Sequence, residues 1–407
     1  MSTHSSLFKP IDGGVCAAQG YLASGIFAGI KKRKKDVALI YSEIPALSAG
    51  VFTQSVTVAA CVTLNQQQLK KSKTTQAILI NSGNANACTG ERGMMNARQT
   101  MATTASALGI TESQILVAST GVIGQFLPMD KITLGIYDAV KELSSEGHTN
   151  AAEGIMTTDT FSKEYAVETS IGGATVRIGG MSKGSGMIAP NMATMLAYVT
   201  TDADITTTAL RKAFKEAVDH SFNRITVDGD TSTNDMAIVL ANGKAENKKI
   251  KERTPEYDQF KRALEHVLIA LSKMIVKDGE GATKFVEVTV QGAKSKHDAE
   301  AAARTICTSS LVKTAIHGED ANWGRILAAV GRSGIKFNPA KTEIYFDNLR
   351  ILGHDYNISF SEAQAKKILQ QKEVTVTVDL HSGDHSATFW TCDLSAEYVR
   401  INASYRT

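Results

Sequence analysis

Near the midpoint of the chain lies the segment Gly179-Gly-Met-Ser-Lys-Gly-Ser-Gly-Met-Ile-Ala-Pro-Asn-Met-Ala193, followed at once by Thr194-Met-Leu-Ala-Tyr-Val-Thr200. Four glycines and a proline within fifteen residues are incompatible with a continuing helix or a central strand, whereas the apolar run after them is typical of a buried strand. On composition alone, a linker between two domains is the plainer interpretation. Linkers are usually polar, however, and this segment contains three methionines and an isoleucine. We therefore expect a buried, bent segment that serves a site.

The composition is that of a globular protein: the chain has 407 residues, of which 43% are hydrophobic and 21% charged. A net charge of +3 gives no reason to expect nucleic acid or a membrane surface as partner. The one basic run, Lys31-Lys-Arg-Lys-Lys35, precedes an apolar stretch, so we interpret it as a solvated turn before a strand. No signal peptide or membrane-spanning stretch is recognisable. Five widely spaced cysteines argue against a disulfide framework and a structural zinc site. A cytoplasmic protein is expected.

Two periodicities alternate along the chain. Short runs rich in Val and Ile predict strands, and apolar residues three and four positions apart predict amphipathic helices. The predicted strands are residues 36–42, 76–81, 114–119, 194–200, 285–291, 343–346 and 373–380, and the predicted helices are residues 207–222, 257–277, 299–315 and 361–371. This mixture predicts an α/β or α+β fold in which helices cover sheets.

A threonine hydroxyl becomes a useful nucleophile when a base accepts its proton. A Thr at a new N-terminus can use its own α-amine, whose unperturbed pKa is about 7.7–8.0. Cleavage before Thr194 would create such a site, and the small Ala193 and the flexible Gly184 and Gly186 are compatible with the tight turn required. Composition does not single out Thr194 among the other threonines, so on this basis the mechanism is only permitted.

The segment Gly180-Met-Ser-Lys-Gly-Ser-Gly-Met-Ile-Ala-Pro-Asn-Met-Ala-Thr-Met-Leu-Ala197 closely resembles the self-processing segment of the ornithine acetyltransferase family, also called glutamate N-acetyltransferases. Other matching blocks extend over essentially the whole chain. They are Asn81-Ser-Gly-Asn-Ala-Asn-Ala-Cys-Thr-Gly90, Ser119-Thr-Gly-Val-Ile-Gly124, Ile155-Met-Thr-Thr-Asp-Thr160, Val227-Asp-Gly-Asp-Thr-Ser-Thr-Asn-Asp235, Lys277-Asp-Gly-Glu-Gly-Ala-Thr-Lys284, His317-Gly-Glu-Asp-Ala-Asn-Trp-Gly-Arg325 and residues 393–407. A set of ordered blocks is far more specific than any one motif.

The resemblance implies transfer of an acetyl group from N2-acetyl-L-ornithine to L-glutamate through an acetyl-Thr194 intermediate. Autocatalytic cleavage between Ala193 and Thr194 would free the nucleophile. The Thr120 hydroxyl and the Gly121 N–H would form the oxyanion hole, which stabilises charge that develops only in the transition state. The substrate-binding positions implied in the same way are Thr157, Lys183, Thr194, Glu280, Asn402 and Thr407.

These positions suit the substrates chemically. Both amino acids carry an α-carboxylate, which Lys183 can pair with, and ornithine adds a terminal ammonium, which Glu280 can receive. A C-terminus that contributes Asn402 and Thr407 to a site would need residues 393–407 to be tied down, unlike most chain ends.

The resemblance also implies a layered helix–sheet sandwich, cleaved into two chains that fold as one unit. Residues 1–193 would form an alpha chain with the oxyanion hole and part of the substrate site, and residues 194–407 a beta chain that begins with the nucleophile. Two chains of each kind would form a heterotetramer. Neither metal nor cofactor is required, because the product retains the energy of the amide. Some family members also use acetyl-CoA to make N-acetylglutamate, and the sequence leaves that second activity open.

Two alternatives differ in class. An aminopeptidase or amidohydrolase would keep the N-terminal Thr and resolve the acyl-enzyme with water. A non-enzymatic, ligand-binding protein would have residues 179–193 as an ordinary linker in an intact chain.

Three weaker signals are discounted. Asp228-Gly-Asp-Thr-Ser-Thr-Asn234 lacks the glycine and the glutamate of a calcium loop and is interpreted as a hydrogen-bonded turn near the site. Residues 279–284 lack phosphate-loop spacing. His381 and His385 are expected to flank a hairpin turn between two strands, rather than to bind a metal.

Overall fold

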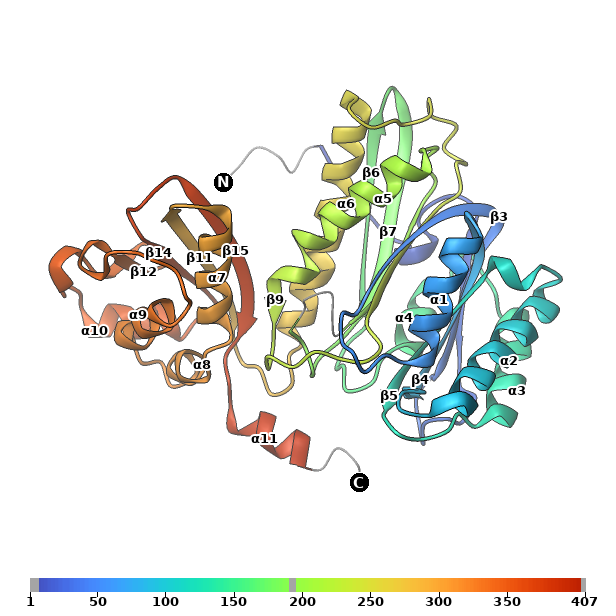
Figure 1. The fold of residues 1–407 in the computed structure, drawn as a ribbon, viewed down its shortest axis with the longest axis horizontal. Helices are drawn as coiled ribbons and strands as arrows, with labels where there is room; N and C mark the ends of the chain where they lie inside the picture. The colour runs from blue at the N-terminus through green and yellow to red at the C-terminus, as the bar shows by residue number, and fades with distance from the viewer. Residues whose placement is uncertain (1–6, 190–194, 404–407) are drawn as a thin grey trace. The chain divides into compact units, whose positions relative to one another are not determined.

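The computed structural model describes residues 7–189 and 195–403, which divide into two units (Figure 1). Unit 1 consists of Met1–Asn223 and Asp230–Ile275, and unit 2 consists of Arg224–Gly229 and Val276–Thr407. Ala193, Thr194 and Thr407 lie outside the described residues.

A mixed sheet forms the centre of unit 1. Its strand order is β1-β6-β7-β8-β10-β3-β4-β5, and β2 pairs with β3. The pairs β4–β5 and β8–β10 are parallel and the other pairs are antiparallel. The strands are β1 (Lys9–Ile11), β2 (Tyr21–Ile26), β3 (Val37–Phe52), β4 (Thr74–Asn84), β5 (Ile115–Val122), β6 (Lys163–Ile171), β7 (Ala174–Lys183), β8 (Leu196–Thr201) and β10 (Met236–Ala241).

Helices cover this sheet through apolar stripes. In α5, Thr206 caps the first turn by accepting the N–H of Ala209, and the helix buries Leu210 and Phe214. Helices α1, α2 and α3 pack against one another and against β3 and β5 (Figure 1). The helices of unit 1 are α1 (Ala60–Lys71), α2 (Gly90–Leu108), α3 (Met129–Lys141), α4 (His148–Gly154), α5 (Thr207–Asp219) and α6 (Pro255–Lys277), whose last two residues belong to unit 2.

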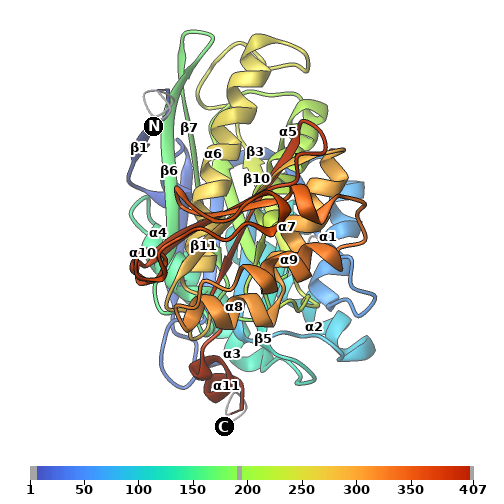
Figure 2. The same ribbon diagram turned by 90° about the vertical axis from the view of Figure 1, so that its left-hand side faces the viewer.

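Unit 2 is built on a second sheet, of strand order β13-β12-β14-β11-β15-β9. Alternating valines of β11 and β14 are buried in its core. Helix α7 packs on β11 and β15, and α9 lies beside α7 (Figure 2). The elements are β9 (Ile225–Thr226), β11 (Phe285–Ala293), β12 (Glu343–Phe346), β13 (Leu349–Leu352), β14 (Glu373–Asp379), β15 (His385–Cys392), α7 (Lys296–Cys307), α8 (Ser310–His317), α9 (Trp323–Gly331), α10 (Glu362–Leu369) and α11 (Ala396–Ala403).

The α/β architecture expected from the sequence is confirmed, and three local predictions are wrong. Residues 299–315 form two helices instead of one, because Ser309 caps α8 by accepting the N–H of Val312. The turn after β14 is not a hairpin turn, because β11 lies between β14 and β15. The first residues of the glycine-rich segment continue strand β7. Glycine is needed there, since a Cβ on Gly179 would lie 2.0 Å from the carbonyl oxygen of Gly14.

The expected cleavage point lies between two neighbouring strands of one sheet. β7 and β8 are antiparallel, with Lys183 opposite Leu196, and β8 is also paired with β10. Strands on both sides of residue 193 therefore belong to the same hydrogen-bonded sheet.

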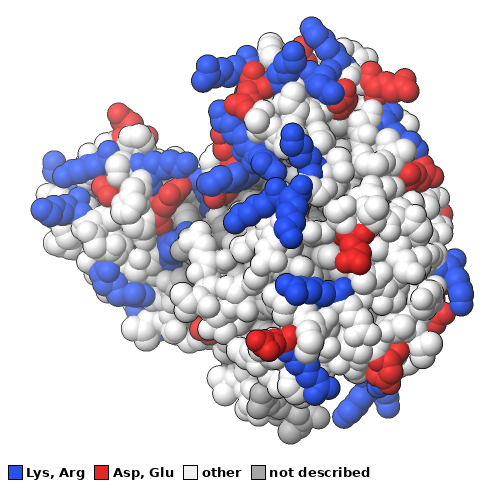
Figure 3. Space-filling view, turned by 45° about the vertical axis from the view of Figure 1, so that its right-hand side comes forward, with Lys and Arg blue, Asp and Glu red and all other residues white. Residues whose placement is uncertain are grey.

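Lysine and arginine side chains are interspersed with acidic ones on the face drawn in Figure 3. Within the described ranges, no helix combines the length and the apolar character needed to cross a membrane.

Candidate functional site

The ends of β4 and β5 bring together two glycines that approach closely. Thr120 is paired with Ser82, and Gly121 with Gly83. Gly121 has a φ of 132°, and a Cβ there would lie only 2.3 Å from the Gly83 carbonyl carbon. No other residue fits at 121 without displacing the neighbouring strand. Thr120, one residue earlier, is buried.

Asparagine side chains hold these strand ends in place. Ser119 donates from Oγ to Asn81 Oδ1 at 2.7 Å, and Asn81 Nδ2 donates to the Asn84 carbonyl at 2.8 Å. Asn234 is buried and donates from Nδ2 to the carbonyls of Ala85 and Ser119, at 2.6 and 2.8 Å. Asn234, the last residue of the predicted turn at residues 228–234, therefore lies next to the residue before Thr120.

Lys183 occupies the last position of β7 and is almost fully buried. Its Nζ donates to Thr120 Oγ1 at 3.4 Å, and so joins an ammonium group to the hydroxyl that the sequence assigned to the oxyanion hole. A cation and a hydroxyl in this arrangement can stabilise negative charge on a substrate oxygen.

A buried carboxylate connects the two loops around Lys183. Asp159 accepts the N–H of Thr157 at 2.9 Å and the N–H of Gly184 at 2.7 Å. It also forms an ion pair with the fully buried Lys163 at 2.7 Å. Burial alone would raise the pKa of Asp159, but the positive charges of Lys183 and Lys163 and these hydrogen bonds hold that pKa well below its usual range.

Sequence reasoning missed Asp159 and Lys163. Asp159 belongs to a quoted block, and an aspartate four residues before a lysine was the available signal. The Asp159 carboxylate thus holds the backbone of both Thr157, which the resemblance assigned to substrate binding, and Gly184, which follows Lys183.

Unit 2 brings together Glu280 and Asn402, the other two described positions predicted to bind substrate. Asn402 Nδ2 donates to Glu280 Oε2 at 2.8 Å, and Glu280 is buried. Nearby, Ser395 Oγ donates to the Gly281 carbonyl at 2.6 Å, and Tyr398 OH to Asp228 Oδ2 at 3.3 Å. Hydrogen bonds to other parts of unit 2 thus extend along the C-terminal segment as far as Asn402.

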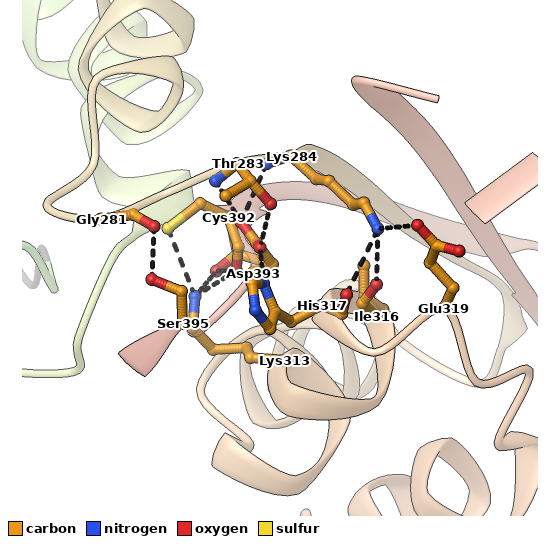
Figure 4. A network of polar contacts seen from close by, with 11 residues as sticks. Gly281, Thr283, Lys284, Lys313, Ile316, His317, Glu319, Cys392, Asp393 and Ser395 are labelled. Atoms are coloured by element: carbon orange, nitrogen blue, oxygen red, sulfur yellow. Dashed lines mark hydrogen bonds and ion pairs between the residues drawn. The ribbon is translucent and has the colours of Figure 1, made fainter. Parts of the chain in front are cut away.

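A polar network anchors the start of this segment (Figure 4). The Asp393 carboxylate accepts the Thr283 N–H and hydroxyl at 2.8 and 2.6 Å, the Lys284 N–H at 2.9 Å, and an N–H of His317 at 2.7 Å. Burial would raise the pKa of Asp393, but these hydrogen bonds lower it below the usual value. The network thus holds residues 283–284, which follow Glu280, against residue 393.

Buried lysines complete the network. Lys313 donates to Thr391 Oγ1 at 2.9 Å and to the Cys392 carbonyl. Lys284 donates to the Ile316 carbonyl at 3.1 Å and lies 3.7 Å from Glu319.

The buried thiols are poor candidates for a nucleophile. Burial raises the pKa of Cys61 to about 11 and the pKa of Cys16 and Cys307 to about 12, and it also raises that of Cys392. At neutral pH these residues stay protonated, and the thiol is far less nucleophilic than the thiolate.

His381 lies in the segment between β14 and β15, and its contacts are with other elements. Its ring lies 3.0 Å from Glu343 and has a centroid distance of 4.9 Å to the His354 ring. The Glu343 carboxylate also accepts hydrogen bonds from Tyr345 at 3.0 Å and Arg350 at 3.1 Å. A guanidinium on the carboxylate competes with a metal ion, so these residues form a hydrogen-bonded ion-pair cluster.

The predicted positions thus form one group in each unit. Unit 1 brings Thr120, Gly121 and Lys183 together and links Thr157 to them through Asp159. Unit 2 pairs Glu280 with Asn402.

Comparison with known proteins identifies similar sequences over nearly the whole chain. Residues 22–407 match the model of the ArgJ family. A protein of Symbiobacterium thermophilum named arginine biosynthesis bifunctional protein ArgJ is 53% identical, over 97% of this chain and 99% of that protein. One of the same name from Caldanaerobacter subterraneus subsp. tengcongensis is 52% identical, over 98% and 99%. A crystal structure of the Bacillus halodurans ArgJ protein has 44% identity, covers 51% of this chain and 97% of its own, and gives a TM-score of 0.49.

Proposed function

The chain belongs to the ArgJ family, and from this premise we propose that it transfers an acetyl group from N2-acetyl-L-ornithine to L-glutamate through Thr194. The protein is an acetyltransferase of arginine biosynthesis that acts on small-molecule substrates. The assignment of individual residues to steps of the reaction is the proposal.

In the first half-reaction, the α-amine of Thr194 accepts the proton of its own hydroxyl, and Oγ attacks the acetyl carbonyl of N-acetylornithine. The carbonyl oxygen becomes an oxyanion, which the Thr120 hydroxyl and the Gly121 N–H stabilise. Ornithine leaves with the proton, and the acetyl group remains as an ester on Thr194. In the second half-reaction, the amine of glutamate attacks this ester and N-acetylglutamate leaves.

The observation that carries the proposal is the 3.4 Å hydrogen bond between Lys183 Nζ and Thr120 Oγ1. Lys183 lies opposite Leu196 in the β7–β8 pair, so the ammonium donor is on the strand next to the one that follows Thr194, whereas Thr120 comes from β5. A developing negative charge at this end of the sheet has both a hydroxyl and an ammonium group to stabilise it. The ammonium also favours a substrate that carries a carboxylate.

Substrate selection is divided between charges of opposite sign. Lys183 and Thr157 bind the end of the amino acid that carries the α-carboxylate. Glu280, held by Asn402, receives the terminal ammonium of ornithine. Thr194 and Thr407 complete the set of substrate-binding positions.

We extend the proposal to maturation and assembly. Cleavage between Ala193 and Thr194 yields an alpha chain and a beta chain, which stay together because β8 is hydrogen-bonded between β7 and β10. Two chains of each kind form a heterotetramer in the cytoplasm. The transfer needs no cofactor, and acetyl-CoA is a second acetyl donor, in keeping with the word "bifunctional" in the names of the relatives.

The decisive experiment is intact mass spectrometry with N-terminal sequencing of the wild-type chain and of Thr194→Ala. We expect two fragments in the wild type, the second beginning Thr194-Met-Leu-Ala, and an uncut, inactive variant. An uncut wild-type chain that still transfers acetyl groups would exclude the α-amine as the base. Release of acetate from N-acetylornithine at the same rate with and without glutamate would indicate a hydrolase instead.

A further inference from the structure

Lys31 is one of two members of the basic run at residues 31–35 that are not exposed. Lys32, Arg33 and Lys34 are exposed, as expected of a solvated turn, whereas Lys31 and Lys35 are half-buried. Lys35 forms an ion pair with Glu153 at 2.7 Å. The loop between β2 and β3 is shaped by the buried Asp36, whose carboxylate accepts the N–H of Ala28 at 2.6 Å and that of Lys31 at 2.9 Å. These bonds fix the backbone of Lys31. Its side chain therefore starts from a defined position.

The ammonium group of Lys31 has few partners. It donates one hydrogen bond, to the Met156 carbonyl at 2.9 Å, although an ammonium has three donors. Among the described residues, no carboxylate lies within ion-pair distance of it. A partly buried cation that has no carboxylate in contact is costly, and the cost falls when an anion binds beside it.

The surroundings of Lys31 are those of the oxyanion hole. Its Cγ lies against Gly83, where a Cβ would be 2.8 Å away, and Gly83 is paired with Gly121. The carbonyl that Lys31 binds belongs to Met156, the residue before Thr157. The ammonium also interacts electrostatically with Lys183 and Asp159. Three separate segments of unit 1 thus place Lys31 beside the residues to which we assign the acetyl transfer.

We propose that Lys31 binds the α-carboxylate of the amino-acid substrates, as a second cation beside Lys183. This inference rests on the proposed function. The side chain of N-acetylornithine ends in an ammonium group and that of glutamate in a carboxylate, so one fixed cation cannot bind the side-chain ends of both substrates. Both amino acids carry an α-carboxylate. In their acetylated forms, only the amide nitrogen and the α-carbon lie between this carboxylate and the acetyl carbonyl carbon. When that carbonyl occupies the oxyanion hole, the α-carboxylate must lie next to it, where Lys31 is.

The first test compares Lys31→Met with Lys32→Met, a matched change at an exposed position of the same run. Acetyl transfer is measured with cleaved enzyme, whose maturation is checked by intact mass. Loss of a charged hydrogen bond predicts a KM for N-acetylornithine and for glutamate raised roughly 10- to 100-fold in Lys31→Met, with kcat within about threefold. Lys32→Met should behave as wild type, and Lys31→Arg should restore most of the affinity.

The second test replaces the substrate carboxylate. In the wild-type enzyme, kcat/KM should be much lower for the α-carboxamide of N-acetylornithine than for N-acetylornithine itself. In Lys31→Met, most of this difference in kcat/KM should disappear. A residue with a merely structural role would slow both substrates equally. Equal discrimination in wild type and variant, or an unchanged KM in Lys31→Met, would overturn the inference. A wild-type chain that matures but transfers no acetyl group would overturn the proposed function, and this inference with it.

The dependence of KM on pH gives a test that needs no destabilising variant. Burial lowers the pKa of Lys31 to about 8; Asp36 and Asp159 oppose this shift, whereas Lys34 and Lys183 add to it. Lys31 is therefore charged at pH 7 and loses its proton as the pH rises through about 8. The wild-type KM should rise between pH 7 and 9 relative to that of Lys31→Arg, whose guanidinium stays charged. Parallel pH profiles would contradict the inference.

Discussion

The Asp159 carboxylate accepts the backbone N–H of Gly184 at 2.7 Å, across 25 residues of sequence. Through this bond it holds the residue that follows Lys183, and a second bond holds Thr157. Its charge faces the ammonium groups of Lys163 and Lys183. One side chain therefore fixes both the loop before β6 and the loop after β7, which makes Asp159 a positioning residue.

Replacing Asp159 with Asn should destabilise the protein by about 3–5 kcal/mol, because the fully buried Lys163 loses the charge that compensates its own. We also expect slower self-cleavage, since Gly184 begins the segment that leads to Ala193. Urea unfolding and a time course of intact mass measure the two effects.

Asp219→Asn is the matched control. Asp219 and Lys215 form an ion pair with the same four-residue spacing in the reverse order, but the Lys215 side chain is 70% exposed and that of Asp219 41%. Solvent screens such a pair, and its loss should cost less than about 1 kcal/mol. Equal effects of the two substitutions would refute a special role of Asp159.

Thr120→Val keeps the shape of the side chain and removes its hydroxyl. We expect kcat to fall by about 10²–10³, because one donor to the oxyanion and the contact with Lys183 are lost together. Thr120→Ser should retain most of the activity. Steady-state kinetics with N-acetylornithine and glutamate decide the matter, and a loss of less than about threefold in Thr120→Val would exclude the hydroxyl from the oxyanion hole.

The sequence predicted elements best where the hydrophobic pattern is uninterrupted. Residues 343–346 coincide with β12, and residues 257–277 lie within α6. Strand β3 is much longer than the predicted residues 36–42, because Glu43 to Pro45 are exposed and its pairing with β4 is irregular between Tyr41 and Ala46. Strands β6 and β7 were not predicted, since the polar residues of β6 and the two glycines of β7 obscure the alternation.

The sequence identified candidate site residues through the family resemblance. It missed residues whose importance comes from contacts that only the fold reveals. Lys183 and Thr120 were predicted, and the structure brings them together. Asn234 was not singled out because its partners are distant in sequence, and the bond from Asp159 to Gly184 spans 25 residues, although Lys163 lies only four residues from Asp159. Lys31 was assigned to a solvated turn, because nothing in a run of like charges distinguishes the half-buried Lys31 and Lys35 from their exposed neighbours.

Gly121→Ala tests the close approach of β4 and β5. The new Cβ would lie 2.3 Å from the Gly83 carbonyl carbon and 2.5 Å from the Asn84 nitrogen. Gly124→Ala is the control, because Gly124 also has a positive φ, of 83°, but open space around it. The control should lose roughly 1–2 kcal/mol of stability from backbone strain alone, and Gly121→Ala clearly more. Similar melting temperatures for the two variants would contradict the packing at Gly121.

Asp393→Asn tests the network that anchors the C-terminal segment. Because the pKa of Asp393 is lowered in the folded protein, its charge contributes stability that is fully present above the unfolded pKa of about 3.9 and is lost as the pH falls through the folded pKa. Asn retains one acceptor oxygen where the carboxylate uses both, so the variant should be less stable at pH 7. The difference in unfolding free energy should shrink as urea titrations move from pH 7 to pH 3. Asp384→Asn, at an exposed position, should change stability by less than about 0.5 kcal/mol at either pH. A wild-type advantage over Asp393→Asn that stays constant down to pH 3 would show that the Asp393 charge does not stabilise the fold.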